Sequence, residues 1–123
     1  LGHLLTMSEP TIFDKIISKE IPATVIYEDD EVLAFNDINP QAPIHALVIP
    51  KGEYVSMADF SANAPEELLN GFFRAVGQTA RNLGLEKEGY RLIANTGENA
   101  HQEVPHLHFH ILSGKKLGPM LTR

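Results

Sequence analysis

The sequence lacks cysteine altogether, which excludes a disulfide framework and a zinc site built from thiolates. It also lacks a basic excess, because 16 acidic residues against 10 lysines and arginines give a formal net charge of −6. Proteins that bind duplex nucleic acid normally present a basic face, so this balance argues against that class, although local donors can still hold one nucleotide. No apolar run approaches the roughly 18 residues of a membrane-spanning helix, so we expect no membrane span.

The composition is otherwise that of one folded domain, with 43% hydrophobic and 21% charged residues in a chain of 123. We expect this single domain to comprise residues 11–123. Residues 1–10 are interpreted as an N-terminal extension or a cloning remnant, since they carry no basic leader and Met7 fits a natural start. Without a targeting signal, a cytoplasmic location is the default expectation.

The hydrophobic periodicity predicts an α+β domain, in which one long helix packs on an antiparallel sheet of about five strands. Thr11 is the expected N-cap of a short helix, and the long helix is expected from Pro65 to Leu83, ended by Gly84. Residues 51–61 are expected to form a connection. So small a sheet has unpaired edges, which dimerisation would close. The expected strands are residues 24–28, 32–36, 44–49, 90–94 and 106–112.

Residues 106–112, with the sequence HLHFHIL, contain three of the six histidines at alternate positions. A period of two is typical of a β-strand, whose successive side chains point to opposite faces. We therefore expect the apolar residues of this segment to face a core and the three imidazoles to line the other face. A row of groups that titrate near neutrality suits acid, base, nucleophile or metal-ligand chemistry.

Two chemistries are open for this row. His106 and His108 could join His45, from another expected strand, in a zinc site of three imidazoles. Three alternating histidines exceed the two that one strand easily offers to an ion, and the row contains no carboxylate to orient its ligands. Alternatively, one imidazole attacks phosphorus and forms a covalent intermediate, while its neighbours donate to the phosphate oxygens.

The segment HLHFHIL fits the pattern His-φ-His-φ-His-φ-φ and resembles the signature of the histidine triad (HIT) family of nucleotidyl hydrolases and transferases. Residues 11–51 resemble the N-terminal half of its Hint branch, the purine nucleoside phosphoramidases, and residues 89–112 resemble the C-terminal half. The final KLGPML is similar to bacterial members. The resemblance implies a homodimeric HIT-like fold.

The resemblance also implies roles for single residues. His108 aligns with the nucleophile that becomes adenylylated. His106 and His110 align with flanking members that orient the nucleophile and contact phosphate or shuttle protons. His45 aligns with a fourth pocket histidine, and Asp37 with the acidic residue that accepts the ribose hydroxyls. On its own, Asp37 would be interpreted as a turn residue.

The resemblance also implies which residues lie near the phosphate, the leaving group and the base of the substrate. Asn95 aligns with a position near the phosphate, and Gln102 and Glu103 are candidates for contact with the leaving group. The apolar residues that align with the purine walls would, without the resemblance, be assigned to the core. They are Ile12, Phe13, Ile16, Phe35, Ile38 and Leu47.

The sequence departs from the family pattern in places. Ala100 and His101 stand where many Hint-type chains have two glycines, and Ser113-Gly114 replaces a frequent glycine pair. We interpret His101 as a solvated loop residue. An arginine typical of the ending of the Fhit branch is missing, which disfavours dinucleoside polyphosphates as the main substrates.

By resemblance, then, the expected activity is cleavage of purine nucleoside 5′-phosphoramidates, and of aminoacyl adenylates, through a nucleotidyl-histidine intermediate that releases AMP. The expected partner is the purine nucleotide substrate, and no cofactor or metal is implied. Two other functions stay open, namely a zinc-dependent hydrolase that uses the histidine row and a nucleotide-binding scaffold with incidental catalysis.

Overall fold

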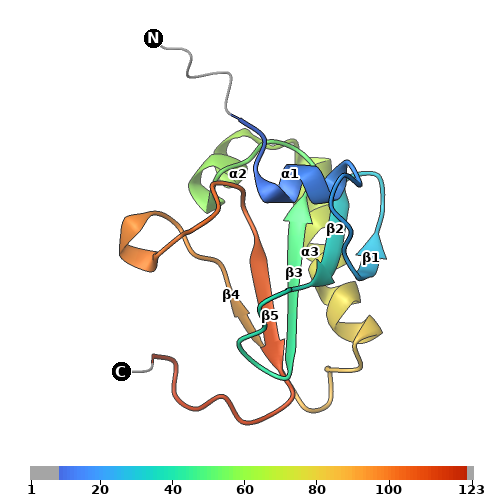
Figure 1. Cartoon of the computed structure of the whole chain (residues 1–123), viewed down its shortest axis with the longest axis vertical. Helices are drawn as coiled ribbons and strands as arrows, with labels where there is room; N and C mark the ends of the chain where they lie inside the picture. The colour runs from blue at the N-terminus through green and yellow to red at the C-terminus, as the bar shows by residue number, and fades with distance from the viewer. Residues whose placement is uncertain (1–8, 122–123) are drawn as a thin grey trace.

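The computed structural model describes residues 9–121, and the predicted N-terminal extension lies outside the described residues except for Glu9 and Pro10. It confirms the α+β fold, with one five-stranded antiparallel sheet in the order β1-β2-β3-β5-β4 (Figure 1). The elements are α1 (Ile12–Ile17), β1 (Val25–Glu28), β2 (Val32–Asn36), β3 (Ile44–Pro50), α2 (Met57–Asn63), α3 (Glu66–Asn82), β4 (Arg91–Ile93), the 3₁₀ turn η1 (Glu98–Ala100) and β5 (Phe109–Ser113).

Of the three inner strands β2, β3 and β5, the first two are buried on both faces. Alternate residues point to opposite sides, so Val32 and Ala34 pack in the core that β2 shares with α3, while Leu33 and Phe35 belong to a second core that includes α1. Helices on both faces therefore explain why β2 and β3 read as continuous apolar runs. The histidines of β3 and β5 lie on the α1 face.

The short helix α1 begins with a capping box. The Thr11 hydroxyl accepts from the backbone N–H of Asp14, and the Asp14 carboxylate accepts from the backbone N–H of Thr11. A helix of six residues is too short to be stable alone, so this cap and the burial of Phe13 and Ile16 hold it in place.

Residues 51–61 were expected to be a connection, and this prediction is wrong, because α2 begins within them. Ser56 caps the helix by accepting from the backbone N–H of Asp59, and Phe60 is fully buried between Tyr54 and Phe72. Two helical turns with one core residue show no apolar period, so the pattern could not indicate a helix.

The strand expected at residues 106–112 begins at Phe109. Its ladder with β3 ends where Val48 pairs with Phe109, and Leu107 donates its N–H to the carbonyl of Tyr54 at 2.7 Å instead. Pro50 has no N–H with which to extend the ladder. The expected division of faces is nevertheless confirmed: Leu107, Phe109 and Ile111 lie in the core shared with α3.

The long helix α3 matches its expected position closely, with Pro65 as N-cap and Gly84 just beyond its end at φ +72°. Phe72 is fully buried on its inner face, whereas Phe73 is half exposed. Among the helices of residues 9–121, none combines the length and apolar character needed to cross a membrane.

Candidate active site

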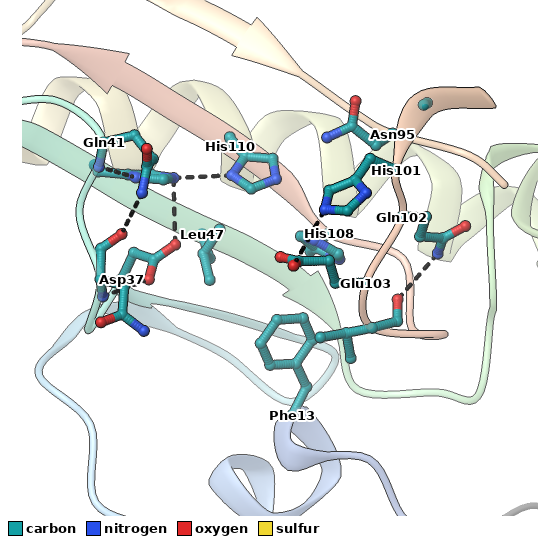
Figure 2. Close-up of a pocket in the computed structure, with 14 residues that line it drawn as sticks. Phe13, Asp37, Gln41, Leu47, Asn95, His101, Gln102, Glu103, His108 and His110 are labelled. Carbon is teal, nitrogen blue, oxygen red and sulfur yellow. Dashed lines mark hydrogen bonds and ion pairs between the residues drawn. The ribbon is translucent and has the colours of Figure 1, made fainter. Parts of the chain in front are cut away.

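Three histidines converge on the α1 face of the sheet. β3 carries His45, β5 carries His110, and His108 lies just before β5, with ring centroids 4.9 Å apart for His108–His110 and 5.1 Å for His45–His110. With Asp37 and the loop that precedes the triad, they line a cavity of about 470 Å³ (Figure 2). The pleat brings these side chains together, because His110 faces Leu47 across the β3–β5 ladder.

His108 is held as a neutral imidazole with a defined tautomer. Its Nδ1 lies 2.7 Å from the carbonyl oxygen of His106, and a carbonyl only accepts, so Nδ1 carries the proton and Nε2 keeps a free lone pair. The ring is 7% exposed, and Phe13 packs edge-on against it at 4.9 Å. Burial lowers the pKa of His108 below its usual 6.5, and the His106 carbonyl and the Asp37 charge counteract this only in part. An imidazole of this kind can attack an electrophile.

His45 and His110 form a hydrogen-bonded chain whose direction is fixed by a backbone amide. Gln41 donates its N–H to His45 Nδ1 at 2.9 Å, so the proton of neutral His45 is on Nε2. That Nε2 donates to His110 Nδ1 at 2.8 Å and lies 3.3 Å from a carboxylate oxygen of Asp37. The proton of His110 is therefore on Nε2, the nitrogen that remains to act on a ligand.

Burial keeps this pair uncharged at neutral pH. Burial, with further contributions from His108 and His45, lowers the pKa of His110 to about 4. Burial also lowers the pKa of His45, against the opposing effect of the Asp37 carboxylate. The site thus contains three neutral imidazoles of defined tautomer, which can donate, accept or attack without first losing a proton.

His106 does not line this cavity. Its ring is 2% exposed, its Nε2 donates to the Pro50 carbonyl at 2.8 Å, and its Nδ1 lies 3.5 Å from a carboxylate oxygen of Asp14. It contributes to the site through its own carbonyl, which holds His108. The phosphate contact expected for His106 has no geometric support.

The zinc alternative required His106, His108 and His45 to converge, and the structure does not bring their ring nitrogens together. In residues 9–121, the group with metal-compatible spacing is Asp37, His45 and His110, whose ligand atoms lie within 4.8 Å of one another. A histidine that binds metal through one nitrogen donates from the other. His45 instead accepts from the Gln41 amide at that position, so these residues do not fit a metal centre.

An apolar pocket of about 260 Å³ adjoins the histidine cavity. Asp37, Phe13 and Leu47 line both, so the carboxylate lies at their junction. Ile38 is 87% exposed and forms part of the rim rather than the wall. All six residues predicted to surround a purine line this pocket: Ile12, Phe13, Ile16, Phe35, Ile38 and Leu47.

The loop before the triad closes the other end of the cavity. The Gln102 side chain accepts from the backbone N–H of Gly97 and donates to the carbonyls of Val55 and Val104, so its amide is occupied in fixing the loop rather than free for a leaving group. His101, in the left-handed region at φ +57°, reaches Glu103 at 3.3 Å. Figure 2 shows both side chains at the cavity beside His108.

The predicted Asn95 and Glu103 both line the cavity. His101, interpreted from the sequence as a solvated loop residue, has a side chain that is 87% exposed and lies at the mouth of the cavity. Sequence reasoning missed the contribution of Gln41. Its backbone amide sets the tautomer of His45, and a backbone group leaves no signal in residue type. The other lining residues that were not predicted are Asn39, Ala100 and Val104.

Comparison with known proteins gives concordant results. Residues 18–117 match the model of the HIT domain. The chain is 53% identical to an uncharacterized HIT-like protein of Azospirillum brasilense over 96% of this chain and 97% of the relative, and 47% identical to the purine nucleoside phosphoramidase of Escherichia coli over 94% and 97%. It superposes on a HIT family hydrolase from Clostridium thermocellum with a TM-score of 0.84 and 42% identity, covering 94% of this chain and all of the other.

Proposed function

The chain belongs to the HIT domain family, and from this premise we propose that it hydrolyses purine nucleoside 5′-phosphoramidates to AMP and an amine. The observation that carries the proposal is His108, a buried neutral imidazole whose Nδ1–H is fixed and whose Nε2 is free in a cavity. The Escherichia coli relative named purine nucleoside phosphoramidase supports the substrate class.

The two adjoining spaces suit the two ends of such a substrate. The apolar pocket accepts the flat base against Phe35 and Leu47, and Asp37, at the junction, accepts hydrogen bonds from the ribose hydroxyls. The α-phosphate then lies in the histidine cavity, within reach of His108 and His110.

In the first step, Nε2 of His108 attacks the α-phosphorus and the P–N bond to the amine breaks. The bonding electrons pass to the amine nitrogen, which takes a proton from His110. His110 gains this proton when the anionic phosphate binds beside it. The nucleotidyl-His108 adduct is cationic and retains its Nδ1–H on the His106 carbonyl. In the second step, water attacks phosphorus, gives its proton to His110 and returns the electron pair to His108, which releases AMP.

The leaving amine would lie at the end of the cavity formed by the loop. His101 and Glu103 line that end and supply a polar wall, which replaces the Gln102 contact expected from the sequence. Glu103 would accept from the amine hydrogens as the P–N bond breaks.

Intact mass spectrometry after rapid quench with an adenosine 5′-phosphoramidate tests the proposal. Wild type should carry an adduct of the mass of AMP, and His108→Ala should carry none and lose several powers of ten in turnover. Turnover that a chelator abolishes, without any adduct, would favour the zinc hydrolase. Tight AMP binding without turnover of any phosphoramidate would favour the scaffold.

We also propose that the protein is a homodimer, as the unpaired sheet edge led us to expect. β4 is an edge strand with a neighbour on one side, and Leu92 in it and Phe73 on α3 are half-exposed apolar residues. The cytoplasmic location and the single domain of residues 11–123 stay predictions.

A further inference from the structure

His106 is buried away from the cavity, yet it has a direct effect on the nucleophile through its main chain. Its carbonyl receives the Nδ1–H of His108 at 2.7 Å, and this hydrogen bond selects the tautomer that leaves Nε2 free. The direction of that carbonyl depends on the orientation of the whole residue. What holds the His106 ring therefore influences His108.

Each ring nitrogen of His106 has a polar neighbour, and the two neighbours come from different parts of the chain. Nε2 donates to the carbonyl of Pro50 at the end of β3, at 2.8 Å. Nδ1 lies 3.5 Å from Oδ1 of Asp14, and this contact is an ion pair that attracts the ring when Nδ1 carries a proton as well as Nε2. With 2% of its surface exposed, the ring has little water to replace either contact.

Asp14 is itself fixed by the capping box of α1. Its Oδ2 accepts from the backbone N–H of Thr11 at 2.8 Å and from the Thr11 hydroxyl at 3.2 Å, which leaves Oδ1 to face His106. Its neighbour Phe13 packs edge-on against the rings of both His106 and His108, at 5.9 and 4.9 Å. The first turn of α1 thus covers both histidines, and Asp14 is its polar contact with His106.

We propose that Asp14 is a positioning residue for the nucleophile: it joins the N-terminus of α1 to the His106 ring and thereby holds the His106 carbonyl that fixes the tautomer of His108. This proposal rests on the proposed function. Asp14 lines neither the histidine cavity nor the apolar pocket, so it does not contact the substrate. Its loss should therefore reduce kcat and leave KM nearly unchanged, because small misplacements of a reacting group slow chemistry more than binding.

The test compares Asp14→Ala with Thr11→Ala on an adenosine 5′-phosphoramidate. Both substitutions break the capping box and should lower the melting temperature by similar amounts. The hydrogen bonds of the Thr11 side chain go to Asp14 and not to a histidine, and the backbone N–H at this position still holds the Asp14 carboxylate in Thr11→Ala. We expect kcat to fall about tenfold in Asp14→Ala, with KM within about twofold of wild type, and to stay near wild type in Thr11→Ala. Asp14→Asn, which retains a polar atom on each side, should recover most of the lost rate.

A second readout requires no turnover. The ¹⁵N chemical shifts of the His108 ring report which nitrogen carries the proton, and they should show one Nδ1–H tautomer in wild type and Thr11→Ala but a mixture in Asp14→Ala. An unmixed tautomer in Asp14→Ala, or an equal loss of kcat in Thr11→Ala, would overturn the proposal. Absence of turnover in wild type would refute the proposed function instead, and the ring spectra would still decide the role of Asp14.

Discussion

The chemistry of single residues in this protein is decided by hydrogen bonds to the main chain. His45 and His108 have similar burial, but His45 accepts at Nδ1 from an amide whereas His108 donates from Nδ1 to a carbonyl. These opposite partners make His45 the start of a hydrogen-bonded chain and His108 a nucleophile. Residue type alone does not distinguish the two roles.

At this scale, Asp37→Ala should selectively remove recognition of ribose. A carboxylate that accepts from sugar hydroxyls contributes about 1.5–3 kcal/mol per charged hydrogen bond, so wild type should prefer an adenosine phosphoramidate over its 2′-deoxy analogue, which lacks one of the two hydroxyls, by about 10- to 100-fold in kcat/KM. The variant should lose most of this preference. Comparing both substrates on both proteins cancels the effect of the substitution on His45, and a preference that survives in the variant would show that Asp37 does not contact the sugar.

The pH dependence of kcat/KM should show an acid limb set by His108. Attack requires the neutral ring, and burial lowers the pKa of His108 below 6.5, so on the acid side activity should fall only as the pH drops below that value. The charge of Glu103 raises the pKa of His108, so Glu103→Gln should move the limb to lower pH. Glu98→Gln, on a side chain that does not line the cavity, is the matched control and should leave the limb in place. A limb above pH 6.5 in wild type would contradict this assignment.

Those residues of the candidate site that act through their side chains could be predicted from the sequence. The four histidines at 45, 106, 108 and 110 and the six purine-wall residues followed from the triad motif and the resemblance. The orientation of the His106 ring and the hydrogen bonds by which Gln102 fixes its loop could not be predicted. Each depends on backbone carbonyls that lie far away in the sequence and come close only in the folded chain. A motif shows which groups are present but not which way a ring points.

At the scale of elements, the sequence predicted what has a clear apolar pattern. The extents of β2 and α3 were predicted to within about two residues, since a continuous apolar run between turn residues defines β2 and helical apolar positions define α3. α2 was missed because Phe60 is its one fully buried residue and gives no apolar period. β5 was started too early because the alternation of residues 106–108 continues beyond the hydrogen-bonded ladder. Side-chain alternation thus reports faces more faithfully than it reports ladder ends.

The turn after β5 provides an element-scale prediction. Gly114 has φ +94°, and a Cβ there would lie 2.7 Å from Pro43 Cβ and 3.2 Å from the backbone nitrogen of Ile44, where β3 begins. Gly84 has a similar φ of +72° but open space around it. Both substitutions to alanine carry a backbone penalty of about 1 kcal/mol, and only Gly114→Ala adds a clash of about 1–3 kcal/mol.

The free energies of unfolding in urea, measured for the two variants and wild type, should therefore rank wild type above Gly84→Ala and Gly84→Ala above Gly114→Ala. Equal destabilisation by the two would mean that the β5 turn yields to the new methyl group and that the approach to Pro43 does not constrain the start of β3.

At the scale of the whole molecule, exposed apolar residues are distributed differently at the two edges of the sheet. The two edges of the sheet differ, because Glu28 of β1 forms ion pairs with Lys19 and Lys51, whereas β4 at the other edge presents the exposed Leu92. Leu92 pairs with Ile111 across the β4–β5 ladder and so shares the α3 side of the sheet, where Phe73 contacts Phe109. An apolar patch beside unpaired strand groups is a surface that a second copy of the chain would bury.

Leu92→Lys should therefore convert the protein to a monomer. Light scattering behind size-exclusion chromatography should give wild type twice the chain mass of 13.6 kDa, and the variant the chain mass itself, because a buried lysine opposite its own symmetry copy is strongly unfavourable. Val25→Lys is the matched control, since Val25 is also 44% exposed but lies on β1 at the other edge. A monomeric wild type at micromolar concentration, or a Val25→Lys variant that dissociates equally, would place the interface elsewhere or remove it.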